Sequence, residues 1–134
     1  MKYDSQGGCY LVSFVAIMAT CALGGENTAD VVYGPPVKLA LVEDPAIEES
    51  SGLARCHSRD DALWTHNDSG DRARLFLIGT NGRTLGTAKV KGVKPDDWED
   101  MCSFRRNGKS YLLIGDIGDN QQQRGELTLC LVEE

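Results

Sequence analysis

The chain has 134 residues, a formal net charge of −6 at pH 7 and a hydrophobic fraction of 41%. A chain of this length predicts a single domain, and the hydrophobic fraction is large enough for a modest core, which excludes a wholly disordered protein. The net acidity argues against a nucleic-acid partner, because phosphate backbones are bound by clustered Lys and Arg side chains.

An apolar run lies close to the N-terminus. Residues 9–25 contain no charged residue and no proline, and the run ends in small residues at 22–24. We therefore predict that residues 1–24 form a signal peptide and that the protein is exported, to the periplasm, the extracellular space or a membrane. Two alternatives stay open. The single basic residue ahead of the run, Lys2, also fits an uncleaved membrane anchor, and Cys21 fits an acylated lipoprotein.

Three of the five cysteines lie outside this leader, at Cys56, Cys102 and Cys130. With three thiols, at most one disulfide can form within the chain. Their spacing matches no zinc-binding pattern. We expect them to be small apolar residues of the core.

The exported part begins with a polar leading segment, residues 25–50, which contains one strand-like run at 37–42. After it, short apolar runs alternate with turns, at 52–57, 63–67, 74–79, 84–90, 100–105, 111–117 and 127–132. Asn-Gly pairs at 81–82 and 107–108, each flanked by apolar runs, predict hairpins. Helical periodicity is absent after the leader, so we predict an all-β chain.

The pattern Asp-x-Gly-Asp occurs twice, at 68–71 and 116–119, and the spacing between the two copies also aligns apolar positions around them. Each copy reads strand, polar turn, strand, Asp-x-Gly-Asp turn, strand, and about 40–50 residues is the size of a propeller blade. We therefore predict a partial β-propeller of about one and three-quarter four-stranded blades, with repeats at 51–98 and 99–134 and a second blade cut short. A sandwich or a small barrel stays open as the alternative.

Oxygen-bearing side chains gather at the two Asp-x-Gly-Asp turns, and carboxylate and amide oxygens on tight turns are typical calcium ligands. The candidate calcium ligands are Asn67, Asp68, Asp71, Asp116, Asp119 and Asn120. The spacing is not that of an EF-hand. The alternative is that these side chains bond their own backbone in Asx turns, which repetition in both units favours.

A second acidic group, Asp97-Trp98-Glu99-Asp100, has no counterpart in the first unit. Residues that do not repeat are the better candidates for function, so these four are the candidate binding residues. An indole between carboxylates can stack on a sugar ring or lie beside a bound cation. The alternative is a wedge between blades with solvated acids around it.

The catalytic candidates are His66, which stands beside Asp68 and is a conceivable general base, and Asp100. No nucleophile elbow, zinc-protease motif or phosphate-binding loop accompanies them. The alternative for His66 is a hydrogen-bonded structural residue, and whether the protein is an enzyme stays open.

Residues 63–71, 97–100 and 115–120 read LWTHNDSGD, DWED and GDIGDN. In this order they resemble the signatures of an uncharacterised family of exported bacterial proteins, and the resemblance covers residues 51–134. It implies a β-propeller and an exported location but no reaction, because a fold does not fix a function. Members of that family are much longer, so the chain resembles their N-terminal third. Calcium-dependent phytase-like phosphoesterases and quinone-dependent sugar dehydrogenases are more distant secreted propellers.

Two functions are compatible with these features. The first is an exported propeller-like binding or structural module, stabilised by calcium, whose ligand is an unknown small molecule or protein. The alternative is the N-terminal part of a calcium-dependent secreted hydrolase of the phytase type. Because one and three-quarter blades leave strand edges unpaired, we also expect self-association or poor folding of the isolated chain.

Overall fold

The computed structural model describes residues 33–134. The predicted leader, with its alternatives of an anchor and a lipoprotein, lies outside these residues. The chain divides into two units at Pro35 and Pro36, and every strand belongs to the second unit. Within the described part, no helix is long and apolar enough to cross a membrane.

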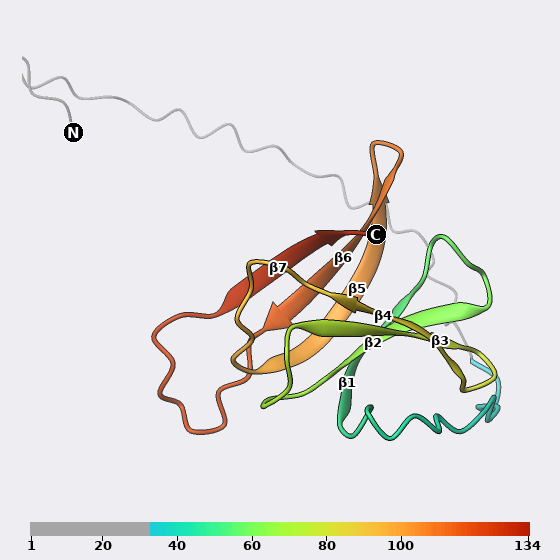
Figure 1. The fold of residues 1–134 in the computed structure, drawn as a ribbon, viewed down its shortest axis with the longest axis horizontal. Helices are drawn as coiled ribbons and strands as arrows, with labels where there is room; N and C mark the ends of the chain where they lie inside the picture. Colours follow the sequence, from blue (N-terminus) through green and yellow to red (C-terminus); the bar gives the residue numbers. More distant parts are fainter. Residues whose placement is uncertain (1–32) are drawn as a thin grey trace, which may run out of the picture. The chain divides into compact units, whose positions relative to one another are not determined.

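Seven strands form two antiparallel sheets, and the described residues contain no helix. Sheet A consists of β1 (Ser50–Arg55), β2 (Ala62–Asn67), β3 (Arg74–Gly79) and β4 (Thr84–Lys89), paired in chain order. Sheet B consists of β5 (Trp98–Arg106), β6 (Lys109–Asp116) and β7 (Thr128–Glu133), also in chain order (Figure 1). The all-β prediction is confirmed, and each of the seven predicted runs that follow the leading segment lies on a strand.

The two Asn-Gly pairs form different turns. Between β5 and β6, Asn107 and Gly108 have φ values of 52° and 78°, the two positive values that a primed two-residue turn requires. Between β3 and β4, only Gly82 has a positive φ, 83°, and the amide of Gly79 donates to the carbonyl of Arg83 over 2.8 Å. The β3–β4 hairpin therefore has a three-residue loop that ends at a glycine in the left-handed conformation.

The hydrophobic core lies between the two sheets. Buried residues of both sheets form one cluster, which comprises Ala54, Leu75, Trp98, Met101, Leu112, Ile114 and Cys130. Trp64 of β2 packs against this cluster. Burial of a large apolar side chain stabilises a fold by roughly 1.5–3 kcal/mol, so this shared core holds the two sheets together.

The predicted strand at 37–42 belongs to neither sheet. This stretch makes no backbone hydrogen bond with the rest of the described chain, and Val37 and Leu39 are 79% and 72% exposed. The chain then passes over one face of sheet A and does not follow either edge of the sheet. On this face, Asn67 Nδ2 donates to the carbonyl of Ala46 over 2.9 Å. A strand without a neighbouring edge has no partner for its amides and carbonyls, whatever its sequence pattern.

The offset that aligns the two Asp-x-Gly-Asp motifs does not align both of the strands that precede each motif. A gap of one residue is needed. At that spacing, Cys102 is the counterpart of Ala54, and Leu112 is the counterpart of Trp64. In the structure Ala54 of β1 faces Trp64 of β2, whereas Cys102 of β5 faces Leu113, one position beyond the expected partner. The loop between β1 and β2 is longer than the two-residue turn between β5 and β6, so the two hairpins have different registers.

The three cysteines within residues 33–134 are all free, and Cys56 and Cys130 are buried as expected. Cys102 is exposed, because it points away from the core on β5, next to the buried Met101. Neighbouring residues of a strand point to opposite faces, so only one of these two side chains can enter the core.

Candidate metal centre

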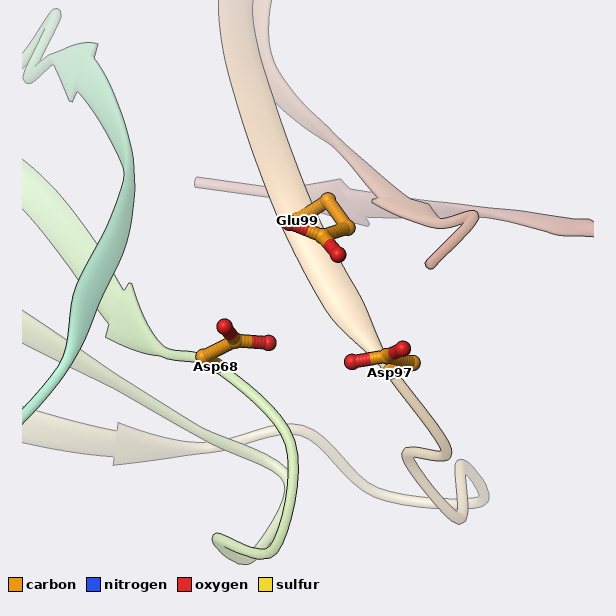
Figure 2. Close-up of side chains that lie close together, drawn as sticks. All are labelled: Asp68, Asp97 and Glu99. Carbon is orange, nitrogen blue, oxygen red and sulfur yellow. The ribbon is translucent and has the colours of Figure 1, made fainter. Parts of the chain in front are cut away.

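Three carboxylates meet where sheet A adjoins sheet B. Asp68 follows the end of β2, Asp97 precedes β5, and Glu99 lies on β5. One carboxylate oxygen from each residue lies within 4.8 Å of the other two, and all three residues are half-buried. Figure 2 shows the three side chains converging from the β2 turn and from β5. We name these three residues the acidic cluster.

Backbone contacts hold the acidic cluster in place. The amides of Ile117 and Gly118 both donate to the carbonyl of Asp97 over 3.1 Å. The hydroxyl of Ser51 donates to the carbonyl of Glu99 and so ties β1 to β5. Contacts from segments far apart in the sequence therefore hold the backbone at both Asp97 and Glu99.

Gly118 gives the carboxylates their room. A Cβ atom at this position would overlap the carboxylates of Asp97 and Glu99. The glycine of the second Asp-x-Gly-Asp motif is therefore required by a close approach of side chains, since no positive φ is found there.

The electrostatics of the cluster are unfavourable without a cation. Burial raises the pKa of Asp97, the nearby carboxyls of Asp68 and Glu99 raise it further, and Arg124 opposes the shift. Asp97 Oδ1 is buried and has no hydrogen-bond partner in the described chain. A divalent cation would relieve the repulsion among the three carboxylates and satisfy this oxygen.

Asp116 supports the loop that carries Asp97. Asp116 is 4% exposed, and its carboxylate accepts hydrogen bonds from the amides of Asp96 and Asp97 over 3.0 and 2.9 Å. Arg124 Nη2 pairs with Asp116 Oδ1 at 2.9 Å. Burial alone would raise the pKa of Asp116, but these amides and the guanidinium outweigh it and hold the pKa below its usual value.

The other predicted calcium ligands lie outside the acidic cluster and are used in turns. Asp71 accepts from the amide of Arg72, from Arg74 Nε and from Asn67 Nδ2. Asp119 accepts from the amides of Gln123 and Arg124, while Asn120 is exposed. Of the six predicted calcium ligands, the structure brings only Asp68 into the cluster.

The four candidate binding residues separate into two groups. Asp97 and Glu99 belong to the acidic cluster, whereas Asp100 is exposed and accepts a hydrogen bond from the amide of Met101. Trp98 is only 2% exposed and lies in the core, so its indole presents no face to a ligand such as a sugar ring. It occupies the place of a wedge between the sheets.

His66 is buried beside Trp98. The two ring centroids are 5.4 Å apart with an interplanar angle of 80°, an edge-to-face arrangement. His66 Nδ1 lies 2.9 Å from the carbonyl of Asn67, and Nε2 has no hydrogen-bond partner in the part of the chain that the structure describes. The structure gives His66 a packing role at the sheet junction.

An open cavity of about 360 Å³ lies beside the acidic cluster. Asp97 and Gly118 line it together with Ser69, Asp119 and Arg124. Ions in solution can therefore reach Asp97 from this side.

Arg124 supports the loop beside the acidic cluster and is not among the site residues predicted from the sequence. It pairs with Asp116 and donates to the carbonyl of Gly118 over 2.8 Å, which places it behind the loop that carries Asp97. One signal was present in the sequence: Arg124 is the only basic residue after Asp116. Its partners could not be assigned without the fold.

Comparisons with known proteins found no relative: no family model matches the chain, and no curated protein or solved structure does so either. The acidic cluster therefore has to be interpreted from its own chemistry.

Proposed function

We propose that the protein is an exported, propeller-like binding and structural module in which a calcium ion joins two blade-like sheets. The observation that carries this proposal is the convergence of Asp68, from sheet A, with Asp97 and Glu99, from sheet B, within 4.8 Å. Calcium takes about 6–8 oxygen ligands in flexible geometry, so three carboxylates supplemented by carbonyls and water are a suitable set.

The chemistry of the ligands favours calcium over softer metals. The acidic cluster offers only carboxylate oxygens, and the described cysteines Cys56, Cys102 and Cys130 are not part of it. Oxygen-only sites select hard cations, whereas thiolate and imidazole ligands select zinc and copper.

A structural role is favoured by where the ligands come from. Asp68 and Asp97 lie far apart in the sequence and belong to different sheets. An ion between them would link these sheets directly and would be bound by the folded state alone, which stabilises the fold.

The propeller part of the proposal is supported by the order of the strands. Each sheet is an antiparallel meander in chain order, and the first strand of sheet B packs against the first strand of sheet A. The resemblance to exported bacterial propellers and the apolar run at 9–25 support the location.

The cavity beside Asp97 supports a second candidate function, the N-terminal part of a calcium-dependent hydrolase of the phytase type. In that function the bound cation would contact a phosphoryl oxygen from the cavity side. Calcium-stimulated hydrolysis of p-nitrophenyl phosphate that is lost in Asp97→Asn would favour the hydrolase, and calcium binding without hydrolysis would favour the structural module.

Calorimetric titration of the full chain with calcium chloride, combined with a thermal melt, tests the proposal. A ligand at a hundredfold excess over its Kd adds about 2.7 kcal/mol to the stability of the folded state, so the Tm should rise by several degrees. We expect Asp97→Asn to abolish both the heat of binding and the rise in Tm.

Asp60→Asn is the matched control. It removes the same charge from a carboxyl whose side chain is 95% exposed and, among residues 33–134, pairs only with Arg55. An unchanged Tm at millimolar calcium in the parent chain, or equal loss of binding in both variants, would contradict the proposal.

A further inference from the structure

Sheet B has an unpaired edge where sheet A has a fourth strand. β7 pairs with β6 from Tyr111 opposite Glu133 to Asp116 opposite Thr128, and no described strand pairs with its other side. The free amides and carbonyls of such an edge are a template for a further strand.

The outer face of sheet B is apolar and uncovered. We define this face by Cys102, Leu113 and Leu131, which lie opposite one another on β5, β6 and β7. On β7, Leu129 and Leu131 point the same way and are 65% and 59% exposed. A groove of about 600 Å³ runs along β7, with Val93 among the residues that line it.

The two sheets stack face to back: the face of sheet A that contacts sheet B corresponds to the face of sheet B that points away from sheet A. The positions of the bulges establish this correspondence. A bulge follows the pair Ser50 and Asn67 in sheet A and the pair Trp98 and Asp116 in sheet B. When the sheets are aligned on these bulges, Ala54 and Trp64 of sheet A correspond to Cys102 and Leu113 of sheet B.

Ala54 and Trp64 form the face with which sheet A covers sheet B. The outer face of sheet B is therefore the counterpart of a face that is already known to pack against another sheet. What it lacks is a following sheet.

The equivalent side of sheet A, its outer side, is already covered, since Thr65 and Phe76, which pair across β2 and β3 on that side, are 0% and 1% exposed. The residues of sheet B that sheet A covers include Met101 and Ile114, whose counterparts in sheet A are Leu53 and Thr65. Leu53 is 55% exposed. Apart from Leu53 on the edge strand β1, the outer side of sheet A is closed, so a second copy can offer sheet B an extended segment and not a sheet face.

Segment 37–42 emerges on this outer side of sheet A. The end of the segment, at Ala40 and Leu41, passes the turn at Gly82, where a Cβ atom would overlap the carbonyl of Leu41. Asp44 then accepts a hydrogen bond from Thr84 over 2.6 Å. Asn67, which shares its face with Thr65, donates to the carbonyl of Ala46.

Segment 37–42 has the pattern of a missing strand. Val37, Leu39 and Leu41 alternate along it and are exposed, and its backbone is unpaired in the described chain. Both surfaces carry charges of both signs, since Lys89, Lys91 and Glu133 line the groove beside β7, and the segment contains Lys38 and is followed by Glu43.

We propose that a second copy of this chain docks on sheet B, with its segment 37–42 added to the free edge of β7 as the fourth strand. The contact is head to tail, since each copy uses a different surface. Strand addition supplies main-chain hydrogen bonds, and the alternating leucines supply apolar contact.

Sedimentation of the full chain across a range of micromolar concentrations tests this arrangement. We expect the parent chain to associate with rising concentration, and Leu39→Pro and Leu131→Lys each to remain monomeric. Leu39→Pro removes an amide that makes no hydrogen bond in the single chain, so loss of folding does not explain its effect. Leu85→Lys, at another exposed leucine, on β4, is the matched control and should associate as the parent does.

Mixing the two monomeric variants gives the decisive result. Leu39→Pro retains an intact β7 edge and Leu131→Lys retains an intact segment 37–42, so an equimolar mixture should form a dimer and nothing larger. A monomeric parent chain, association of either variant alone at the parent's level, or a mixture that stays monomeric would overturn the proposal. Every variant retains the apolar run at 9–25. If the chain associated through this run, each variant alone would associate at the parent's level.

Discussion

Gly118 sets how closely the carboxylates of the acidic cluster can approach the turn after β6. Its missing side chain leaves the space that the carboxylates of Asp97 and Glu99 occupy. The sequence pattern predicts this glycine only as part of a repeated turn. In the structure, its main role is to leave room for acids on a neighbouring strand.

We predict that Gly118→Ala weakens calcium binding and lowers the stability of the fold. The added methyl group would push the two carboxylates apart, and overpacking of this kind costs about 1–3 kcal/mol. Calorimetric titration with calcium and urea unfolding would measure the two effects. Gly125→Ala is the control, because a Cβ atom at Gly125 meets nothing within 4 Å. Equal behaviour of the two variants would show that the space at Gly118 is unimportant.

The sequence alone identifies the acidic residues of the cluster as candidates, but it does not show which of them lie close together. The sequence predicts that Asp68 binds calcium together with Asp71 and Asp116, since the three share a repeated motif. The structure directs Asp71 and Asp116 to nearby amides and guanidinium groups and directs Asp68 to Asp97. The difference depends on which sheet faces pack together, and this information is not local in the sequence.

At the scale of elements, the strands were predictable and their partners were not. Period-two patterns and turn residues placed 74–79 at the observed limits of β3, and the other six strands close to theirs. The same pattern at 37–42 predicted a strand that pairs with nothing in the described chain. A strand pattern records a preference for extended backbone, whereas pairing depends on an available edge.

The hairpin turn at Gly82 offers a test of how the leading segment packs on sheet A. Gly82 and Gly108 have similar φ values, 83° and 78°, so alanine at either position pays the same backbone strain of about 1–2 kcal/mol. Only at Gly82 would the new Cβ atom also overlap the carbonyl of Leu41.

We therefore expect Gly82→Ala to be more destabilising than Gly108→Ala. Chemical denaturation of the two variants measures the difference. Equal losses would mean that the chain near Leu41 moves aside at no cost and that the leading segment is not fixed at this turn.

At the scale of the whole molecule, the end of β7 is tied to sheet A through Glu134. Its carboxylate accepts hydrogen bonds from Cys56 Sγ over 2.8 Å and from the amides of His57 and Ser58 over 3.0 and 3.2 Å. Burial alone would raise the pKa of Glu134, but these donors outweigh it and lower the pKa from 4.5 to about 2.

A carboxyl whose pKa is depressed by folding stabilises the fold above its unfolded pKa and loses this effect as the pH falls through its folded pKa. We therefore expect Glu134→Gln to be less stable than the parent chain at pH 7, with the difference shrinking between pH 4.5 and about 2. Urea unfolding at a series of pH values measures this convergence.

Glu133→Gln is the control for this series, because Glu133 forms an exposed ion pair with Lys109. A stability difference for Glu134→Gln that stays constant down to pH 2 would show that its ionised carboxylate is not the stabilising group.

The face-to-back stacking of sheets A and B also bears on how such a chain could have arisen. An interface between unlike faces of one repeated unit can be used again each time the unit is copied, so duplication of a gene segment adds a sheet without requiring a new surface. Cys102 and Leu113, on the outer face of sheet B, stand where a further copy would attach. In such a lineage the number of sheets can change by one unit at a time, while the chemistry of each junction, such as the acidic cluster, diverges separately.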